Sequence, residues 1–277
     1  MDNWLHFGRK YGNISNSIYV TGRRGFLMLA VTRRNAIKAQ LLERKSVTIS
    51  DLSHHLHVTK ETIRRDLRLM EEQGDLIRTH GGAYILDGVQ NDIDISIRQV
   101  IKAEEKNVIA EKCLQHIQSG DSIFLDMSTT CWFLARQLIN HNLTVLTTSL
   151  QIATILSSSP DIRLIMIGGV FSPNSMSFQG ENTCKTLRNY YVDKAFISCR
   201  SLSMENGITD ISEDVAAIHN LVIQRSNYTY LILDSSKIGP TSFAFSCDIT
   251  AIDAVICDQP LPELWRDYLK KQDILVF

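Results

Sequence analysis

The segment from Val58 to Leu67 restricts the fold of this chain more than any other stretch, because it has the pattern of a short amphipathic helix with a cationic surface. Thr59 is suited to cap such a helix, since its hydroxyl can accept a hydrogen bond from an otherwise unpaired N–H group of the first turn. Ile63, Leu67 and Met70 recur at helical spacing and form one apolar face. The remaining surface carries Lys60, Arg64, Arg65 and Arg68. A short cationic helix with a packed back fits the major groove of DNA.

Segments on both sides of this helix complete a small DNA-binding module. Upstream, residues 33–44 predict a first helix, and Ser50 is expected to cap a second helix over 51–56. Downstream, residues 76–78 and 83–85 predict a hairpin around two glycines. The alternative is a three-helix unit whose charges form only a solvated face. The capped cationic helix and the glycine-tipped hairpin follow in the order of a winged helix-turn-helix, which is the interpretation we adopt.

The expected DNA contacts follow from this arrangement. Arginines on a recognition helix read guanine edges or position the module on phosphate, and the sequence does not separate these roles. Arg78 and His80 in the predicted wing suit contact with phosphate or the minor groove, and a purely structural role suits them equally well. The predicted DNA-binding residues are Thr59, Lys60, Thr62, Arg64, Arg65, Arg68, Arg78 and His80.

The charge of the chain is unevenly distributed. Residues 1–80 contain 14 Lys and Arg against 8 Asp and Glu, a net charge of +6. Residues 81–277 contain 15 against 22, a net charge of −7. A basic N-terminal part suits a DNA-binding module, and the acidic remainder is not expected to bind nucleic acid. The length of 277 residues fits two domains.

Cysteine usage and hydropathy indicate the compartment. The six cysteines are scattered and include no Cys-x-x-Cys pair, so we expect neither a zinc site nor a disulfide framework. No apolar run approaches the ~18 residues of a membrane span. These features predict a cytoplasmic protein without metal, cofactor or membrane contact. Residues 1–27 lack clear periodicity, and we expect either a flexible arm or a segment that precedes a natural start at Met28.

From Ile93 onward the sequence alternates between helix-like and strand-like segments. This alternation predicts an α/β fold with a doubly wound, mostly parallel sheet covered by helices on both faces. Expected strands lie at residues 122–125, 143–146, 163–167, 195–198, 228–233 and 254–256. The predicted organisation is an extension over residues 1–30, a winged helix-turn-helix over 31–86, a linker over 87–100, and an effector-sensing and oligomerisation domain over 101–277.

Hydroxyl-rich and glycine-rich turns follow several predicted strands, and ligands of such sheets bind at the carboxyl ends of the strands. Residues 128–130 are Ser-Thr-Thr at the start of a predicted helix, where N–H groups and hydroxyls converge in a way that suits a phosphate. Asp126 beside them suits sugar hydroxyls. The glycines at 168–169 allow backbone to approach a ligand, and Lys237 can balance the phosphate charge.

The segment from Arg33 to Ala83 closely resembles the N-terminal domain of the DeoR family of bacterial transcription regulators, through Thr-Ile-Arg-Arg-Asp-Leu at 62–67 and His-Gly-Gly-Ala at 80–83. The resemblance continues more loosely to Asp258. It implies a second domain similar in fold to ribose-5-phosphate isomerase, which senses a phosphorylated sugar or a related metabolite. The family's motifs fall on Asp126, Ser128, Thr129, Thr130, Thr147, Gly168, Gly169, Asp234, Ser236 and Lys237.

Two positions depart from the family pattern. Thr148 stands where Asn is common, and Ser-Cys-Arg-Ser at 198–201 replaces a Gly-rich segment. Arg200 therefore joins the predicted ligand-binding residues, and the identity of the effector is left open.

Together these features predict a repressor of a carbohydrate-utilisation operon, which binds double-stranded operator DNA and a phosphorylated sugar as a homo-oligomer, either dimer or tetramer. The competing hypothesis is a sugar-phosphate isomerase-like enzyme with a DNA-binding domain. The isomerase's Asp-Gly-Ala-Asp-Glu type of segment has no counterpart here, so no catalytic residues and no enzymatic activity are expected.

Overall fold

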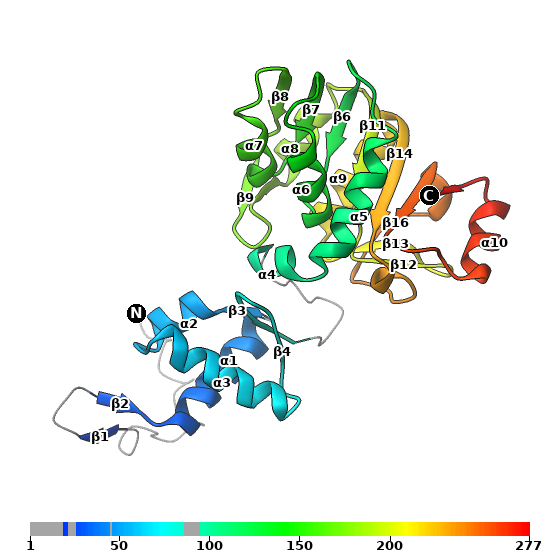
Figure 1. Ribbon diagram of the computed structural model, residues 1–277. Coiled ribbons are helices and arrows are strands. Elements are labelled where there is room, and N and C mark those ends of the chain that lie inside the picture. Colours follow the sequence, from blue (N-terminus) through cyan, green and yellow to red (C-terminus); the bar gives the residue numbers. More distant parts are fainter. Residues whose placement is uncertain (1–18, 22–25, 45, 86–94) are drawn as a thin grey trace, which may run out of the picture. The chain divides into compact units, whose positions relative to one another are not determined.

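The computed structural model describes residues 19–21, 26–44, 46–85 and 95–277, which divide into two compact units (Figure 1). The first unit ends at Arg78 and includes Gly82–Ile85, and the second holds Thr79–Gly81 and the chain from Leu86 onward. Most of the predicted N-terminal extension and the first part of the predicted linker lie outside the described residues. Two short strands, β1 (Tyr19–Thr21) and β2 (Phe26–Met28), pair antiparallel before the first helix.

The first unit is a winged helix-turn-helix, as the sequence predicts. Its elements are α1 (Ala30–Arg44), β3 (Ser46–Thr48), α2 (Ile49–His55), α3 (Lys60–Glu72), β4 (Ile77–Arg78) and β5 (Gly82–Tyr84). Strand β5 lies between β3 and β4 and pairs antiparallel with both. Ile37 of α1, Leu52 of α2 and Ile63 of α3 are fully buried in one core. The three helices therefore pack around a common centre, with the small sheet at its side.

The start of α2 differs from the sequence expectation. The helix begins at Ile49, and Thr48, not Ser50, is its N-cap, with Thr48 Oγ1 accepting from the Asp51 N–H at 3.0 Å. Thr48 has the extended backbone conformation that an N-cap requires. Ile49 is buried in the core of the unit, and this packing places the helix start two residues earlier than the hydroxyl pattern alone indicates.

A buried ion pair joins the first and third helices. Arg33 Nε lies 2.5 Å from Asp66 Oδ2, and a second guanidinium nitrogen lies 3.2 Å from Asp66 Oδ1. The Asp66 side chain is only 3% exposed. The aspartate of the Thr-Ile-Arg-Arg-Asp-Leu segment therefore faces inward and fixes α3 on α1, while the neighbouring arginines face solvent.

The second unit contains a parallel seven-stranded sheet, which confirms the predicted fold class. Its strands are β6 (Ser122–Leu125), β7 (Leu143–Thr147), β8 (Ile162–Met166), β11 (Val192–Ile197), β14 (Ser226–Leu233), β16 (Ala254–Cys257) and β17 (Leu275–Val276). They lie in the order β17-β16-β14-β11-β6-β7-β8, with every neighbouring pair parallel. All carboxyl ends therefore meet at one edge of the sheet.

Helices cover both faces of this sheet (Figure 1). One layer is α5 (Ala103–Leu114), α6 (Thr129–Gln137) and α7 (Leu150–Leu156), and the other is α8 (Glu181–Leu187), α9 (Glu213–Gln224) and α10 (Glu263–Lys271). Alternation along each strand divides the side chains between the two layers. Ile123 and Leu125 of β6 pack under the first layer, and Phe124 packs under the second.

Several elements of the second unit are not among those expected from the sequence. A hairpin of β9 (Val170–Ser172) and β10 (Ser177–Gln179) follows β8, and an antiparallel sheet is formed by β12 (Ser201–Ser203), β13 (Gly207–Asp210) and β15 (Ala244–Cys247). Helix α4 (Ile95–Val100) lies within the predicted linker, and Ile95 and Ile97 are buried. Turns of 3₁₀ helix occur at Ser235–Lys237 and Ile249–Ala251. No helix of the described residues is long and apolar enough to span a membrane.

Candidate functional site

Helix α3 has the cap and the faces that the sequence predicts. Thr59 is its N-cap, and Thr59 Oγ1 accepts from the Thr62 N–H at 3.2 Å. Ile63 and Leu67 are buried against the other helices. Lys60 is exposed at the start of the helix. The cationic surface of α3 is thus presented outward from a packed base, which is the form that a groove of DNA accepts.

The predicted DNA-binding arginines differ in their partners. Three form ion pairs, Arg64 with Glu61 at 3.2 Å, Arg68 with Glu72 at 3.2 Å and Arg78 with Glu71 at 2.7 Å. The hydrogen bond from the Arg78 side chain lowers the pKa of Glu71. Lys60 and Arg65 are exposed and form no ion pair with any residue that the structure describes. Exposed pairs are worth ~0–1 kcal/mol, so a DNA phosphate can displace the carboxylates. His80 is exposed in the wing.

In the second unit, Asp126 organises the turn after β6. Its Oδ1 accepts from the Ser128 N–H at 2.8 Å, and its Oδ2 accepts from the Ser198 N–H, after β11, at 2.7 Å. Burial raises the pKa of Asp126, but contact with His219 and hydrogen bonds with Ser128 and Ser198 lower it by more, so the pKa lies below its ordinary value. The ionised carboxylate therefore joins the ends of two neighbouring strands. Its contact with sugar hydroxyls stays a prediction.

The start of α6 presents free hydrogen-bond donors beside this turn. Ser128 caps the helix, with its Oγ accepting from the Cys131 N–H at 3.0 Å. The N–H groups of Thr129 and Thr130 have no acceptor among the described residues. Thr130 Oγ1 is also buried without a hydrogen-bond partner in the described part of the chain. Buried polar groups are rarely left unpaired, so these donors indicate a place for an anion.

Lys237 lies in the same network, after β14. Its Nζ donates to Ser198 Oγ at 3.1 Å and to the Cys199 carbonyl oxygen at 2.7 Å. Because the Ser198 N–H binds Asp126, the lysine connects to the turn that begins α6. Burial raises the pKa of Asp234, but the charge of Lys237 and a hydrogen bond from Ser236 lower it by more. The pKa of Asp234 therefore lies below its ordinary value. The structure thus brings the predicted residues from β6 and β14 together.

The predicted ligand-binding residues at the ends of β7 and β8 make hydrogen bonds and packing contacts within the chain. Thr147 is fully buried, and its Oγ1 accepts from the Ser149 N–H at 3.0 Å. The Gly168 carbonyl accepts from Thr183 Oγ1 at 3.0 Å. A Cβ added at Gly169 would lie 1.9 Å from Thr183 Oγ1. Close approach of α8 therefore accounts for glycine at 169, and a ligand contact there stays a prediction.

Arg200 is held through its backbone. Its N–H donates to Asp210 Oδ1 and to the Thr209 carbonyl oxygen, both at 3.1 Å. These bonds join the turn after β11 to β13. The predicted contact of the Arg200 side chain with a ligand stays a prediction.

His219, on the inner side of α9, lies between two carboxylates. Its Nδ1 is 2.8 Å from Asp210 Oδ2, and its Nε2 is 3.3 Å from Asp126 Oδ2, within ion-pair distance. Ser246 Oγ donates to the same oxygen of Asp210 at 2.6 Å. Burial lowers the pKa of His219, but the two aspartates raise it to about 10. A buried imidazolium therefore ties the turn after β6 to α9 and to the small sheet.

Lys106 of α5 is a second buried cation. It is 4% exposed, and its Nζ donates to the carbonyl oxygens of Arg98 at 2.5 Å and Ile101 at 2.7 Å. Burial lowers the pKa of Lys106 to about 7, and the charge of Lys237 acts in the same direction while Asp234 opposes it. Lys106 thus joins the end of α4 to α5, close enough to the Asp234 turn to respond to its charges.

Comparison with known proteins agrees with this architecture. A family model for the DeoR-like helix-turn-helix domain matches residues 33–89, and one for the DeoR C-terminal sensor domain matches residues 101–259. The chain belongs to the DeoR family. It is 37% identical over 234 residues to the HTH-type transcriptional regulator YulB of Bacillus subtilis (strain 168), over 84% of this chain and 91% of the relative.

Two further similarities place this DeoR-family regulator among known proteins. It is 29% identical to the glycerol-3-phosphate regulon repressor of Escherichia coli (strain K12), over 85% of this chain and 93% of the relative. Ribose 5-phosphate isomerase A from Methanocaldococcus jannaschii is 17% identical over 49% of this chain and 54% of its own, with a TM-score of 0.37. This likeness to the isomerase covers about half of each chain.

Sequence reasoning about this DeoR-family chain missed His219, Asp210 and Lys106. The histidine lies in the middle of a helix, and Asp210 ends a strand that the alternation pattern does not show. A lysine on a helix with acidic neighbours is ordinarily solvated, so burial of Lys106 has no local signal. Only the tertiary fold brings these groups beside the predicted phosphate-binding turns.

Proposed function

We propose that this DeoR-family regulator represses a carbohydrate-utilisation operon and leaves its operator when a phosphorylated sugar binds at the ends of β6, β11 and β14. The observation that carries the proposal is the convergence at one edge of the sheet. Free N–H groups of Thr129 and Thr130 begin α6, and Lys237 is connected to the same turn through Ser198 and Asp126.

The chemistry of this edge favours a phosphate over a neutral sugar. Backbone N–H groups at a helix start attract an anion, and Lys237 adds a positive charge beside them. The carboxylates of Asp126 and Asp234 are engaged by turn N–H groups, so they hold the donors in place. The similarity to a glycerol-3-phosphate regulon repressor supports an effector with a phosphate group.

Control of DNA binding requires that the effector prefer one of two states of the protein. Paired half-sites in an operator require paired DNA-binding modules, so the proposal includes a homo-oligomer held by the second unit. We place the protein in the cytoplasm, where a regulator of this kind meets chromosomal DNA.

Isomerase activity is not part of the proposal. Isomerisation needs a base free to move a proton between neighbouring carbons. Asp126, the carboxylate nearest the start of α6, already accepts from two N–H groups and contacts His219. Its bonds suit it to binding rather than to proton transfer. Turnover of any pentose or hexose phosphate by the purified protein would overturn this part of the proposal.

Replacement of Lys237 tests the proposed phosphate site. In Lys237→Met the charge is lost and the methylene chain is kept, so we expect the Kd for inorganic phosphate, measured by titration calorimetry, to rise at least tenfold, about 1.4 kcal/mol. Lys185→Met is the matched control, because Lys185 is exposed on α8 and, within the part of the chain that the structure describes, forms an ion pair only with Glu181. Equal phosphate affinity in the two variants would show that Lys237 is structural and that the site lies elsewhere.

A further inference from the structure

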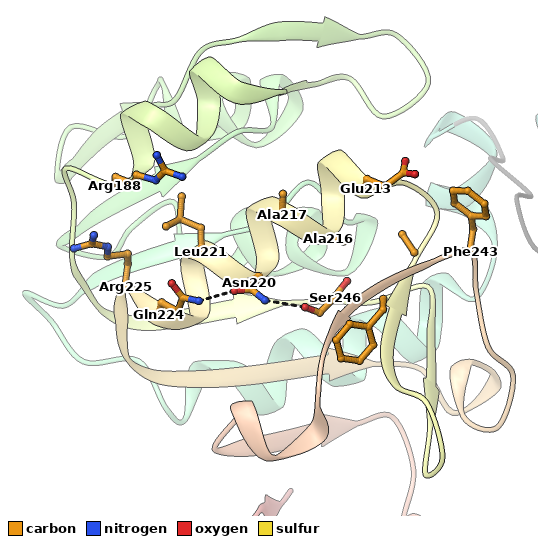
Figure 2. Close-up of a pocket in the computed structure, with 12 residues that line it drawn as sticks. Arg188, Glu213, Ala216, Ala217, Asn220, Leu221, Gln224, Arg225, Phe243 and Ser246 are labelled. Carbon is orange, nitrogen blue, oxygen red and sulfur yellow. Dashed lines mark hydrogen bonds between the residues drawn. The ribbon is translucent and has the colours of Figure 1, made fainter.

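A hollow of about 740 Å³ runs along the outer side of α9, between the end of α8 and β15. None of the predicted ligand-binding or DNA-binding residues lines it. Arg188 and Arg225 lie at one end of α9, and Glu213 and Phe243 lie at the other (Figure 2). The hollow therefore has a cationic end, an acidic end and an apolar side.

The apolar side is formed by two exposed aromatic rings. Phe243 is 47% exposed and Phe245 is 59% exposed. Phe245 lies in β15 and Phe243 directly precedes it. This strand pairs only with β13 among the described strands and is therefore an edge of the small sheet. Single exposed apolar residues are ordinary on a protein surface, but two exposed rings that line the same hollow are the kind of apolar feature that marks an interaction surface.

The outer face of α9 itself is a stripe that changes character along its length. Glu213, Ala217, Asn220 and Gln224 are exposed at helical spacing. The acid stands at the helix start and Arg225 follows the helix end, where its guanidinium lies 4.6 Å from the ring of Tyr191. A small residue, Ala217, stands between them. The stripe is therefore acidic at its start and small in its middle, and Arg225 adds a cation to the hollow beside its far end.

Such a stripe is complementary to itself when reversed. A two-fold axis through the middle of α9 would place two copies of the helix antiparallel. The start of each helix would then contact the end of the other, so that every contact occurs twice. The helix is 12 residues long, about 18 Å at 1.5 Å per residue, so Glu213 of one copy would face Arg225 of its partner. Antiparallel helix dipoles favour the same arrangement.

The polar side chains in the middle of the stripe are already paired within the chain. Asn220 Nδ2 donates to the Ser246 carbonyl oxygen at 3.1 Å, and Gln224 Nε2 donates to Asn220 Oδ1 at 2.6 Å (Figure 2). Removing water from these groups on association therefore leaves few donors without an acceptor. Ala217 beside them permits close approach of a second helix, at the 8–10 Å typical of packed helices.

We propose that this surface, formed by the outer face of α9 with Phe243 and Phe245, is the contact between two copies of the chain. The inference rests on the proposed function, because a repressor that reads two half-sites needs two copies. It also gives the effector a route to the operator. His219 lies on the inner face of α9 and contacts Asp126, so the phosphate-binding turn and the contact between copies share one helix.

Charge reversal in the full-length protein tests this contact, with the dissociation constant of the dimer measured by analytical ultracentrifugation. Glu213→Arg and Arg225→Glu each place like charges opposite one another, and each should raise this constant at least tenfold. The two changes combined restore opposite charges and should return it to within threefold of the unaltered protein. Leu264→Arg is the control, because Leu264 is 72% exposed on α10 and should not affect association.

Ala217→Arg provides a second variant, because it places a large side chain in the middle of the stripe while Arg225 and Tyr191 are left unmutated. Loss of dimer in Ala217→Arg, with inorganic phosphate binding and the melting temperature unchanged, supports the proposal. A monomeric unaltered protein, unchanged association in Ala217→Arg, or failure of the double reversal to restore association would overturn it. If these variants associate normally while phosphate and DNA still bind, only this inference fails. If the unaltered protein does not bind phosphate, the proposed function itself is contradicted.

Discussion

The two buried cations of the second unit should make stability depend on pH in opposite directions. His219 has a pKa raised from 6.5 to about 10, and Lys106 has a pKa lowered from 10.5 to about 7. The perturbations are His219→Gln and Lys106→Met, which remove one titrating group each. The slope of the free energy of unfolding against pH is then compared between each variant and the unaltered protein. This comparison isolates the contribution of each group, because the remaining titrating residues are common to all the proteins.

The signs follow from proton counting. Between pH 6.5 and about 10 the folded protein holds the His219 proton and the unfolded chain does not, so stability present below pH 6.5 is lost as pH rises, by ~1.4 kcal/mol per pH unit. Between about pH 7 and 10.5 the unfolded chain holds the Lys106 proton and the folded protein does not, so stability rises by a similar ~1.4 kcal/mol per pH unit. The two slopes cancel in the unaltered protein.

Each variant should therefore reveal the slope of the cation that it keeps. From pH 7.5 to 8.5, the free energy of unfolding should rise by ~1.4 kcal/mol in His219→Gln and fall by ~1.4 kcal/mol in Lys106→Met, relative to the unaltered protein. The window ends below pH 9 because buried thiols such as Cys131, whose pKa burial raises, begin to titrate there in the unfolded chain. His219→Gln should also be less stable throughout, by ~3–5 kcal/mol, because two buried carboxylates lose their cation.

Urea unfolding monitored by tryptophan fluorescence provides the assay. In a Trp4→Phe background the emission comes from Trp132 and Trp265, which both lie in the second unit, so the signal follows the unit that holds both cations. Lys271→Met, on an exposed lysine of α10, is the control and should keep the slope of the unaltered protein. If the free energy of unfolding of His219→Gln and that of Lys106→Met changed with pH in the same direction and by the same amount, the reasoning would be refuted.

Three further predictions concern the DNA-binding unit. Replacing Arg64 and Arg65 together by Ala should abolish specific binding to operator DNA in an electrophoretic shift assay, whereas replacing the two exposed lysines that end α10 should not; retained tight binding would contradict the assignment of α3. Asp66→Asn should destabilise this unit by ~3–5 kcal/mol in thermal unfolding, since it breaks a buried ion pair, and a smaller change than 1 kcal/mol would argue against that role. Gly82→Ala should lower DNA affinity without affecting phosphate binding, because a Cβ would lie 2.0 Å from the Val47 carbonyl oxygen and disrupt the wing, and normal DNA affinity would show that the wing adapts.

Periodic features of this fold could be predicted from the sequence because they repeat locally. The stripe of Ile63 and Leu67 identifies the inner face of α3, and runs of apolar residues identify the parallel strands. The cap of α2 could not be placed in this way. Thr48 and Ser50 are both hydroxyl residues after a strand, and burial of Ile49 in the core decides between them.

The candidate site could be predicted only in part, for a similar reason. The N–H donors at the start of α6 could be predicted from Ser128 and its neighbours, because an N-cap depends only on residues close in sequence. Two partners of Asp126, Ser198 and His219, are distant in sequence, and the buried position of His219 depends on how α9 packs on the sheet. At Gly169 the contact with Thr183 gives a structural reason for glycine that the sequence does not show, and the predicted contact with a ligand stays a prediction.

The most direct test of the central claim is release of DNA by a phosphorylated sugar. Full-length protein bound to labelled DNA from beside its own gene would be titrated with pentose and hexose phosphates and with the corresponding free sugars, and release followed by fluorescence anisotropy. The account predicts that at least one phosphorylated sugar releases the DNA, that its unphosphorylated form does not at the same concentration, and that Lys237→Met resists release. Equal release by the free sugar, or full release from Lys237→Met, would contradict it.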